Sequence, residues 1–204
     1  MIKYGSLNMM LRSLKTRFSH RSDTERWEDE ANLDELWEHR SRLIAGLIDT
    51  GSKVLEFGAG RGVLRNYLCQ SCKYTASDVV YRNEDSLVID LNSFPLPNIE
   101  MYHFDTAVFA GVIEYLVNFP GVISWLGDST KSCIISHNCI SNDYGIIKKR
   151  IEIIRRHSYG WNSSFTEIEL ISLLNKHGFQ LKEKIKWETS DGNEDIFLLQ
   201  KSDL

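Results

Sequence analysis

The sequence has few prolines and lacks long apolar runs, internal repeats and low-complexity tracts. Only three of its 204 residues are proline, and no proline-rich linker separates two folded parts. No apolar run approaches the roughly 20 residues that span a bilayer, and no short apolar stretch with a small-residue cleavage site lies near the start. We therefore expect a cytoplasmic protein without a transmembrane segment.

The composition is that of an ordinary globular protein. Hydrophobic residues make up 42% and aromatic residues 11%, so the chain can bury a core, and its length suits one domain with an appendage. The formal net charge of -4 gives no overall attraction to nucleic acid or to an anionic membrane, although charge can be distributed unevenly. We expect no nucleic-acid partner.

Four cysteines raise the question of a zinc site. Cys69 and Cys72 form a CxxC, and Cys133 and Cys139 lie downstream with His137 between them. However, Cys133 falls in an apolar, strand-like run, where a free cysteine behaves as a small core hydrophobe. We expect four reduced thiols and no metal.

The apolar pattern changes near Gly51. Residues 1–50 are highly charged, and their larger apolar side chains follow roughly helical spacing: Trp27, Leu33, Leu36, Trp37, Leu43 and Ile44. Beyond this point the chain has short apolar segments rich in β-branched residues, which predict strands over 53–57, 73–80, 86–91, 105–111 and 132–138. Alternating strands and helices of this kind indicate an α/β fold with a buried parallel sheet.

The last third predicts one helix and two strands. A helix begins at Thr166, which can form a capping box with Glu169, and it ends at Gly178. The predicted strands at 180–189 and 195–201 are separated only by SDGNE. Because so short a connection cannot contain a crossover helix, these strands should pair antiparallel.

The segment VLEFGAGRGVLRNYL, residues 54–68, predicts a strand, a glycine-rich turn and a helix. Such a corner of a doubly wound sheet binds ligands, because glycines let ligand atoms approach the backbone. A dinucleotide fingerprint is GxGxxG, whereas Gly58, Gly60 and Gly62 have GxGxG spacing and follow Glu56. The spacing therefore counts against a dinucleotide.

These motifs resemble those of class I S-adenosylmethionine (SAM)-dependent methyltransferases. The acidic-x-GxGxG motif is Glu56 to Gly62, Asp78 ends the next strand in YTASD, and VIDLNSFPLP and FDTAVFAGVIEYL match the third and fourth strand segments. The resemblance covers residues 51–201. It implies a Rossmann-like doubly wound sheet of seven strands, in the order 3-2-1-4-5-7-6 with the last pair antiparallel. Residues 51–204 would form the methyltransferase domain, and residues 1–50 a helical extension that closes over the cofactor.

The resemblance also assigns SAM-binding roles. Glu56 would orient the methionine ammonium group, Asp78 would accept hydrogen bonds from the ribose hydroxyls, and Asp90 would accept one from the adenine amino group. The remaining contacts would come from Gly58, Ala59, Gly60, Gly62, Leu91, Ala110 and Gly111. Carboxylates at the ends of three successive strands fit this reading better than separate cap or turn residues, because ligands bind at that edge of such sheets.

The acceptor side has several candidate catalytic residues. Glu114 and Tyr115 follow the fourth predicted strand, and His137 and Asn138 follow the fifth. A general base is optional, because holding donor and nucleophile in near-attack geometry supplies much of the catalysis. Several members of the family carry a histidine where Tyr115 stands, and the motif for methylating base amines, Asn or Asp followed by Pro-Pro and an aromatic residue, is absent.

Two basic stretches bear on partners. KKRIEIIRRH spans 148–157, and the first 22 residues contain no acid but five cations: Lys3, Arg12, Lys15, Arg17 and Arg21. Each stretch is consistent with a solvated helix face, an anionic acceptor such as a nucleotide-linked or lipid-linked sugar, or peripheral contact with a membrane. The first stretch also has the composition of a transit peptide.

The sequence as a whole predicts a methyltransferase. It would move the methyl group of SAM to an oxygen or nitrogen of a small-molecule acceptor, and SYGWNSSFT and GVIEYL resemble small-molecule enzymes, including those of polysaccharide pathways, which favours a sugar. The alternatives are a nicotinamide-dependent oxidoreductase and a non-catalytic protein with the same fold.

Overall fold

The computed structural model describes residues 7–29, 37–189 and 192–202. Its strands are β1 (Lys53–Phe57), β2 (Lys73–Asp78), β3 (Ser86–Val88), β4 (Thr106–Ala110), β5 (Ser132–His137), β6 (Phe179–Thr189) and β7 (Gly192–Lys201). Its α-helices are α1 (Leu7–Ser19), α2 (Thr24–Glu28), α3 (Trp37–Ala45), α4 (Phe119–Leu126), α5 (Ile146–His157) and α6 (Glu167–Lys176).

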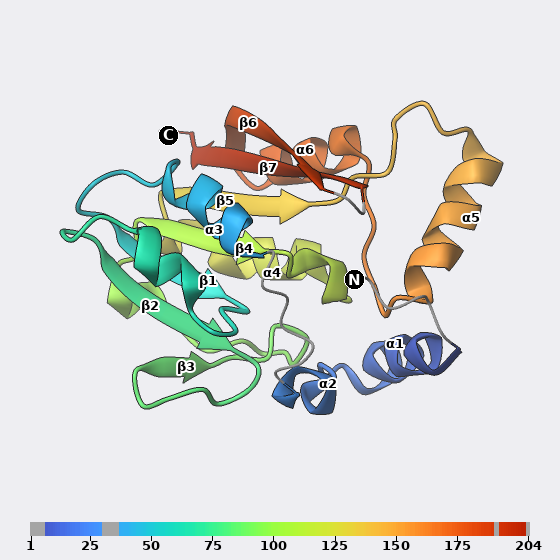
Figure 1. Cartoon of the computed structure of the whole chain (residues 1–204), viewed down its shortest axis with the longest axis horizontal. Coiled ribbons are helices and arrows are strands. Elements are labelled where there is room, and N and C mark those ends of the chain that lie inside the picture. Colours follow the sequence, from blue (N-terminus) through green and yellow to red (C-terminus); the bar gives the residue numbers. More distant parts are fainter. Residues whose placement is uncertain (1–6, 30–36, 190–191, 203–204) are drawn as a thin grey trace.

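The strands form one seven-stranded sheet in the order β3-β2-β1-β4-β5-β7-β6 (Figure 1). The first five strands in this order run parallel, and β7 pairs antiparallel with both β5 and β6. The predicted α/β fold, strand order and antiparallel end are therefore confirmed. The chain moves outward from β1 to β3 and returns to β4, so the topological switch lies between β1 and β4.

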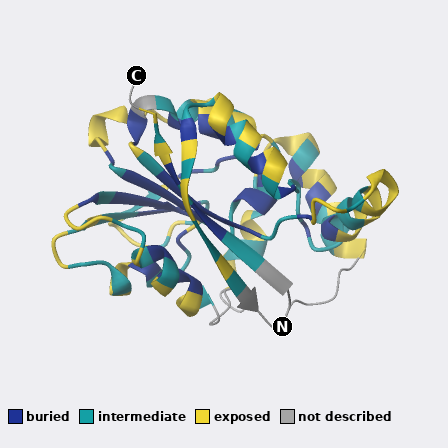
Figure 2. Cartoon of the chain, turned by 90° about the horizontal axis from the view of Figure 1, so that it is seen from above, coloured by how far each residue is buried: buried dark blue, intermediate teal, exposed yellow. Residues whose placement is uncertain are grey.

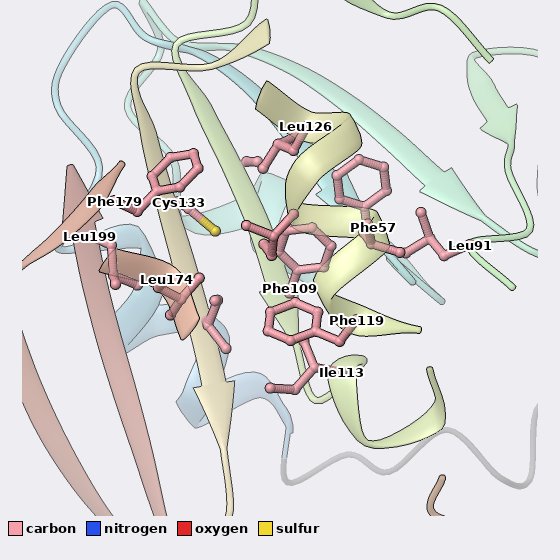
Figure 3. Close-up of a cluster of buried hydrophobic side chains, with 14 of the residues drawn as sticks. Phe57, Leu91, Phe109, Ile113, Phe119, Leu126, Cys133, Leu174, Phe179 and Leu199 are labelled. Atoms are coloured by element: carbon pink, nitrogen blue, oxygen red, sulfur yellow. The ribbon is translucent and has the colours of Figure 1, made fainter. Parts of the chain in front are cut away.

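Each central strand sends alternate side chains to opposite faces of the sheet, as a strand must. Phe57 and Phe109 stack on one face with ring centroids 4.7 Å apart, under α4 and α6 (Figure 3). Val54 and Val108 point to the other face, where Ile44 of α3 covers them. Figure 2 shows the resulting layers, with buried strands between helices that are exposed on their outer sides.

Cys133 is fully buried within the first of these clusters, as predicted for a core hydrophobe. All four cysteines are unpaired in the structure. Among the described residues, no group of three or more potential ligands could hold a metal ion. Nor does any helix in the described ranges have the length and apolar character needed to cross a bilayer.

The predicted capping box of α6 is present. The hydroxyl of Thr166 accepts a hydrogen bond from the amide of Glu169, whose carboxylate accepts one from the amide of Thr166. Gly178 follows with φ +83°, a left-handed conformation that ends the helix. These local rules therefore predicted the start and the end of α6 correctly.

One prediction of local structure was wrong. The glycine-rich turn leads into a short 3-10 helix, η2 (Val63–Tyr67), rather than a full α-helix, because only Leu64 of this turn is buried and α3 packs against it. The N-terminal segment is helical as predicted, but it is divided into α1, α2 and α3, since α2 stops at Glu28 and Asp29 is extended. Leu33 and Leu36, which contributed to the predicted helical spacing, lie outside the described residues.

Candidate functional site

A cavity lies at the carboxyl edge of the sheet, beside the topological switch. From the sheet side it is lined by Gly58, Asp78, Ile89, Leu91, Ala110 and Gly111, and from the N-terminal segment by Ser22, Trp27 and Trp37. A second cavity shares Trp37, Gly58 and Ala110 with the first, and adds Glu56, Ala59 and Arg40. The sequence motifs therefore converge on one region.

Asp78 is held rigidly at the end of β2. One carboxylate oxygen accepts from the amide of Gly60 at 2.8 Å, and the other accepts from the amide of Val80 at 3.0 Å. Arg82 lies 3.4 Å from the first oxygen. Because each carboxylate oxygen has two lone-pair sites, acceptor capacity remains for a ligand. Asp78 is thus a fixed, buried anion that lines the cavity.

The glycine-rich turn needs its glycines. Gly58, Gly60 and Gly62 all have φ between +53° and +67°, the left-handed region that L-residues disfavour. A Cβ on Gly58 would also lie 2.6 Å from a methyl carbon of Val112. Of the three, Gly58 lines the cavity, whereas Gly60 anchors Asp78 and Gly62 lies beside the Tyr74 hydroxyl.

Glu56 is a buried carboxylate at the end of β1. Burial raises its pKa to about 7, although a hydrogen bond from Tyr74 and the positive charge of Arg40 act in the opposite direction. The Tyr74 hydroxyl donates this bond at 2.5 Å. Glu56 therefore changes charge close to neutral pH.

Arg40 is a site residue that the sequence did not reveal. It lies on α3, is 6% exposed, and pairs with Glu194 of β7 at 3.1 Å. Its guanidinium occupies the space beside Gly111, where a Cβ would lie 2.5 Å from Nη1. Within the described part of the chain its buried Nε has no hydrogen-bond partner. The sequence could not single out Arg40, because it stands among many charged residues of the N-terminal segment and belongs to no motif.

The candidate catalytic residues separate into two groups. Tyr115 lines the cavity and meets Trp27 edge-on, with ring centroids 4.8 Å apart, while burial raises the pKa of its hydroxyl. Glu114 and His137 form a buried pair instead, with Nδ1 of His137 2.7 Å from a Glu114 oxygen. Burial alone would raise the pKa of Glu114, but His137, together with a backbone hydrogen bond and the charge of Arg40, lowers it below the ordinary value.

Both nitrogens of His137 are engaged. Its Nε2 accepts from the amide of Phe165 at 3.4 Å, so Nδ1 carries the proton and donates to Glu114. Asn138 accepts hydrogen bonds from Arg156. The geometry therefore gives Glu114, His137 and Asn138 partners within the protein, and only Tyr115 of these four candidates lines the cavity.

Asp90 does not line the cavity, although Leu91 beside it does. Its two oxygens accept from the amide and the hydroxyl of Ser22 at 2.9 and 2.6 Å, and from the amide of Asn92 at 3.0 Å. A bond from an adenine amino group would have to compete with Ser22. In the structure Asp90 ties the N-terminal segment to the end of β3.

Comparison with known proteins agrees with this architecture. A family model described as a methyltransferase domain matches residues 26–184. A search among curated proteins gives no significant match. One similar solved structure is 1,6-didemethyltoxoflavin-N1-methyltransferase of Burkholderia thailandensis, with bound 1,6-didemethyltoxoflavin and S-adenosylhomocysteine. Its TM-score is 0.69 at 17% identity, and the alignment covers 98% of this chain and 92% of that enzyme.

Two further solved structures share the fold. Magnesium protoporphyrin IX methyltransferase from Synechocystis, with bound SAM, has a TM-score of 0.59 at 16% identity over 98% of this chain and 100% of its own. Human N-acetylserotonin methyltransferase, in complex with SAM, has a TM-score of 0.62 at 15% identity. The alignment covers 94% of this chain and 67% of the human enzyme. Since the family model spans most of the sequence, the chain belongs to the methyltransferase-domain family, and the predicted resemblance to methyltransferases is confirmed in family and in fold.

Proposed function

We propose that this chain transfers the methyl group of SAM to an oxygen or nitrogen atom of a small-molecule acceptor. The observation that carries the proposal is Asp78, a buried carboxylate that two backbone amides fix at the cavity wall, beside the glycine-rich turn. An acceptor-only group with free lone pairs suits a pair of ribose hydroxyls.

The charges around the second cavity fit the amino-acid end of SAM. Glu56 offers a carboxylate for the ammonium group, and Arg40 offers a buried guanidinium, with its Nε unpaired in the described structure, for the carboxylate. SAM would supply a methyl group made electrophilic by the sulfonium. The contribution of this chain is then to bind, orient and desolvate the donor beside the acceptor.

The N-terminal segment would act as the cover of this site. Besides the Ser22–Asp90 contact, Arg82 donates to the carbonyl oxygen of Trp27 at 2.8 Å. With this segment in place the cavities measure about 80 and 280 Å³. Ligand pockets commonly measure roughly 300–1,000 Å³, so the segment would move outward when SAM enters.

The acceptor side would be formed by Trp27 and Tyr115. These rings also border a small cavity that continues beneath α1, together with Arg26 and Asn162. Aromatic walls offer a large apolar contact area to the ring of an acceptor. The sugar expected from the sequence has no support from these walls, and none of the neighbours' names denotes a sugar.

Thermal unfolding with candidate ligands tests the proposal. SAM or S-adenosylhomocysteine at about 100 times its dissociation constant should add roughly 2.7 kcal/mol, which is several degrees for a chain of this length. NAD and NADP should leave the melting temperature unchanged. A shift with NAD alone would instead support an oxidoreductase, and no shift with any of these ligands would support a non-catalytic protein.

A further inference from the structure

Helix α1 packs with its apolar side outward. Its apolar residues at positions 7, 11, 14 and 18 have the spacing of a single helical face. Leu7, Leu11, Leu14 and Phe18 are between 40% and 84% exposed, whereas Ser13 and Thr16 are buried. Ser13 and Arg17 bond to Asn162, so polar contacts hold the inner face against the protein. The apolar side of α1 is not used in packing.

Helix α5 has the same inverted arrangement. Ile147, Ile151 and Ile154 form one face and are at least 60% exposed. The buried residue of this helix is Arg156, which bonds to Glu152 and to Asn138. Two helices that bury polar residues and expose apolar ones differ from the usual surface helix, in which the apolar face points to the core.

The two helices lie next to each other at one end of the molecule (Figure 1). Arg17 of α1 reaches His157, the last residue of α5, at 3.5 Å. We name the exposed apolar residues of both helices, with the cations beside them, the basic–apolar surface. It consists of Leu7, Leu11, Leu14 and Phe18 of α1, Ile147, Ile151 and Ile154 of α5, and Lys15, Lys148 and Arg150.

The charge of this surface identifies what would cover it. Helix α1 contains no acidic residue, and the one acid of α5, Glu152, is already paired with Arg155 and Arg156. Lys15 and Arg150 are exposed and have no ion pair within the described ranges. A symmetric contact with a second copy of the chain would bring cations against cations. An anionic lipid surface instead matches both the apolar stripes and the charges at their edges.

We propose that the basic–apolar surface binds the interface of an anionic membrane, with α1 and α5 lying in the membrane plane. Leu, Ile and Phe side chains would enter the boundary between headgroups and acyl chains, while Lys15, Lys148 and Arg150 contact the phosphates. This contact is independent of methyl transfer. It places the small cavity beneath α1, which reaches Tyr115, next to the lipid surface.

Co-sedimentation of the full chain with vesicles tests the proposal. Vesicles of phosphatidylcholine and phosphatidylglycerol in equal amounts should bind the protein, and vesicles of phosphatidylcholine alone should not. Raising the salt from about 0.1 M to about 1 M should weaken binding, because the Debye length falls from roughly 10 to 3 Å. No binding to the anionic vesicles, or equal binding to both kinds, would overturn the proposal.

Matched variants locate the contact. Replacing both cations, by Lys15→Gln together with Arg150→Gln, should weaken vesicle binding about 25-fold, from roughly fivefold for each cation. Leu11→Ser with Phe18→Ser should weaken it at least about tenfold. Met101→Ser, an equally exposed apolar position just before β4, should leave it unchanged. Circular-dichroism melts and SAM binding should stay as in the wild type for all three variants, which separates this test from the proposed function.

Two results would refute the assignment. Wild-type binding by both double variants would show that other residues hold the lipid. Self-association of the wild type by light scattering, lost in Leu11→Ser with Phe18→Ser, would show that a second copy covers the surface instead. Binding that follows both the charge and the apolar variants is the result expected for an anionic membrane.

Discussion

Replacing Glu56 with glutamine should stabilise the fold at alkaline pH and weaken SAM binding. The folded chain holds the Glu56 proton up to a pKa of about 7, against an ordinary value of 4.5. Between these values the folded state binds a proton that the unfolded state releases, so wild-type stability falls as the pH rises. The loss of folding stability caused by ionising Glu56 is absent well below pH 4.5 and complete above pH 7. Glutamine never ionises, so Glu56→Gln removes this loss of stability.

The pKa shift of Glu56 sets an upper limit on the stability that Glu56→Gln can gain. One pKa unit corresponds to about 1.4 kcal/mol, so the complete penalty is on the order of 3 kcal/mol. The pKa of about 7 already includes the attraction of Arg40, but the glutamine amide group would be buried beside Tyr74 with donors that need new partners, which reduces the gain. We expect a net gain of about 1–2 kcal/mol near pH 8, or roughly 2–8 °C in melting temperature.

The assay is thermal unfolding of both proteins near pH 5 and near pH 8. Glu56→Gln should melt higher than the wild type near pH 8, and the difference should shrink near pH 5, where Glu56 is largely protonated. Titration calorimetry near pH 8 should show weaker SAM binding by Glu56→Gln, because the ammonium group loses its counter-charge. A pH-independent difference in melting temperature, or a variant less stable near pH 8, would refute the reasoning.

Three further predictions concern the glycine turn, α6 and the CxxC. Gly58→Ala should lower the melting temperature and the SAM affinity, since alanine meets both a positive φ and Val112; an unchanged melt would contradict this. Thr166→Ala should lower the free energy of unfolding by about 1 kcal/mol, or the melting temperature by roughly 2–4 °C, and Thr166→Ser should restore the wild-type stability. If Thr166→Ala melts at the wild-type temperature, the capping bond contributes nothing to stability. Hydrogen bonds from Cys72 and Ser71 lower the pKa of Cys69 to about 6, so native alkylation with iodoacetamide, followed by peptide mapping, should be half-maximal near pH 6. A midpoint near 8.5, the ordinary thiol value, would show that these bonds do not form.

The sheet was predictable because its signals are local. Strand residues such as Val54 and Leu55 alternate between two apolar faces, and the short link before β7 excluded a crossover helix. The start of α6 followed from Thr166 and Glu169, three residues apart. The position of Asp78 at the end of a predicted strand likewise indicated the sheet edge at which the cavity lies.

The remaining errors concern contacts between distant residues. Arg40 pairs with Glu194, 154 positions away, and Ser22 binds Asp90, 68 positions away. No periodicity or motif reports such pairs, since they depend on how the N-terminal segment folds back over the sheet. The position of His137 at the end of β5 suggests that it faces the acceptor, but its pairing with Glu114 depends on tertiary packing.

Titration calorimetry of Asp78→Ala with SAM tests the central claim most directly. Two charge-assisted hydrogen bonds of roughly 1.5–3 kcal/mol each, partly replaced by water, predict a loss of about ten- to a thousandfold in affinity. Asp85→Ala removes the same charge from an exposed loop before β3 and should bind SAM as the wild type does. If folded Asp78→Ala binds SAM within twofold of the wild type, Asp78 is not a SAM ligand and the proposed site is wrong.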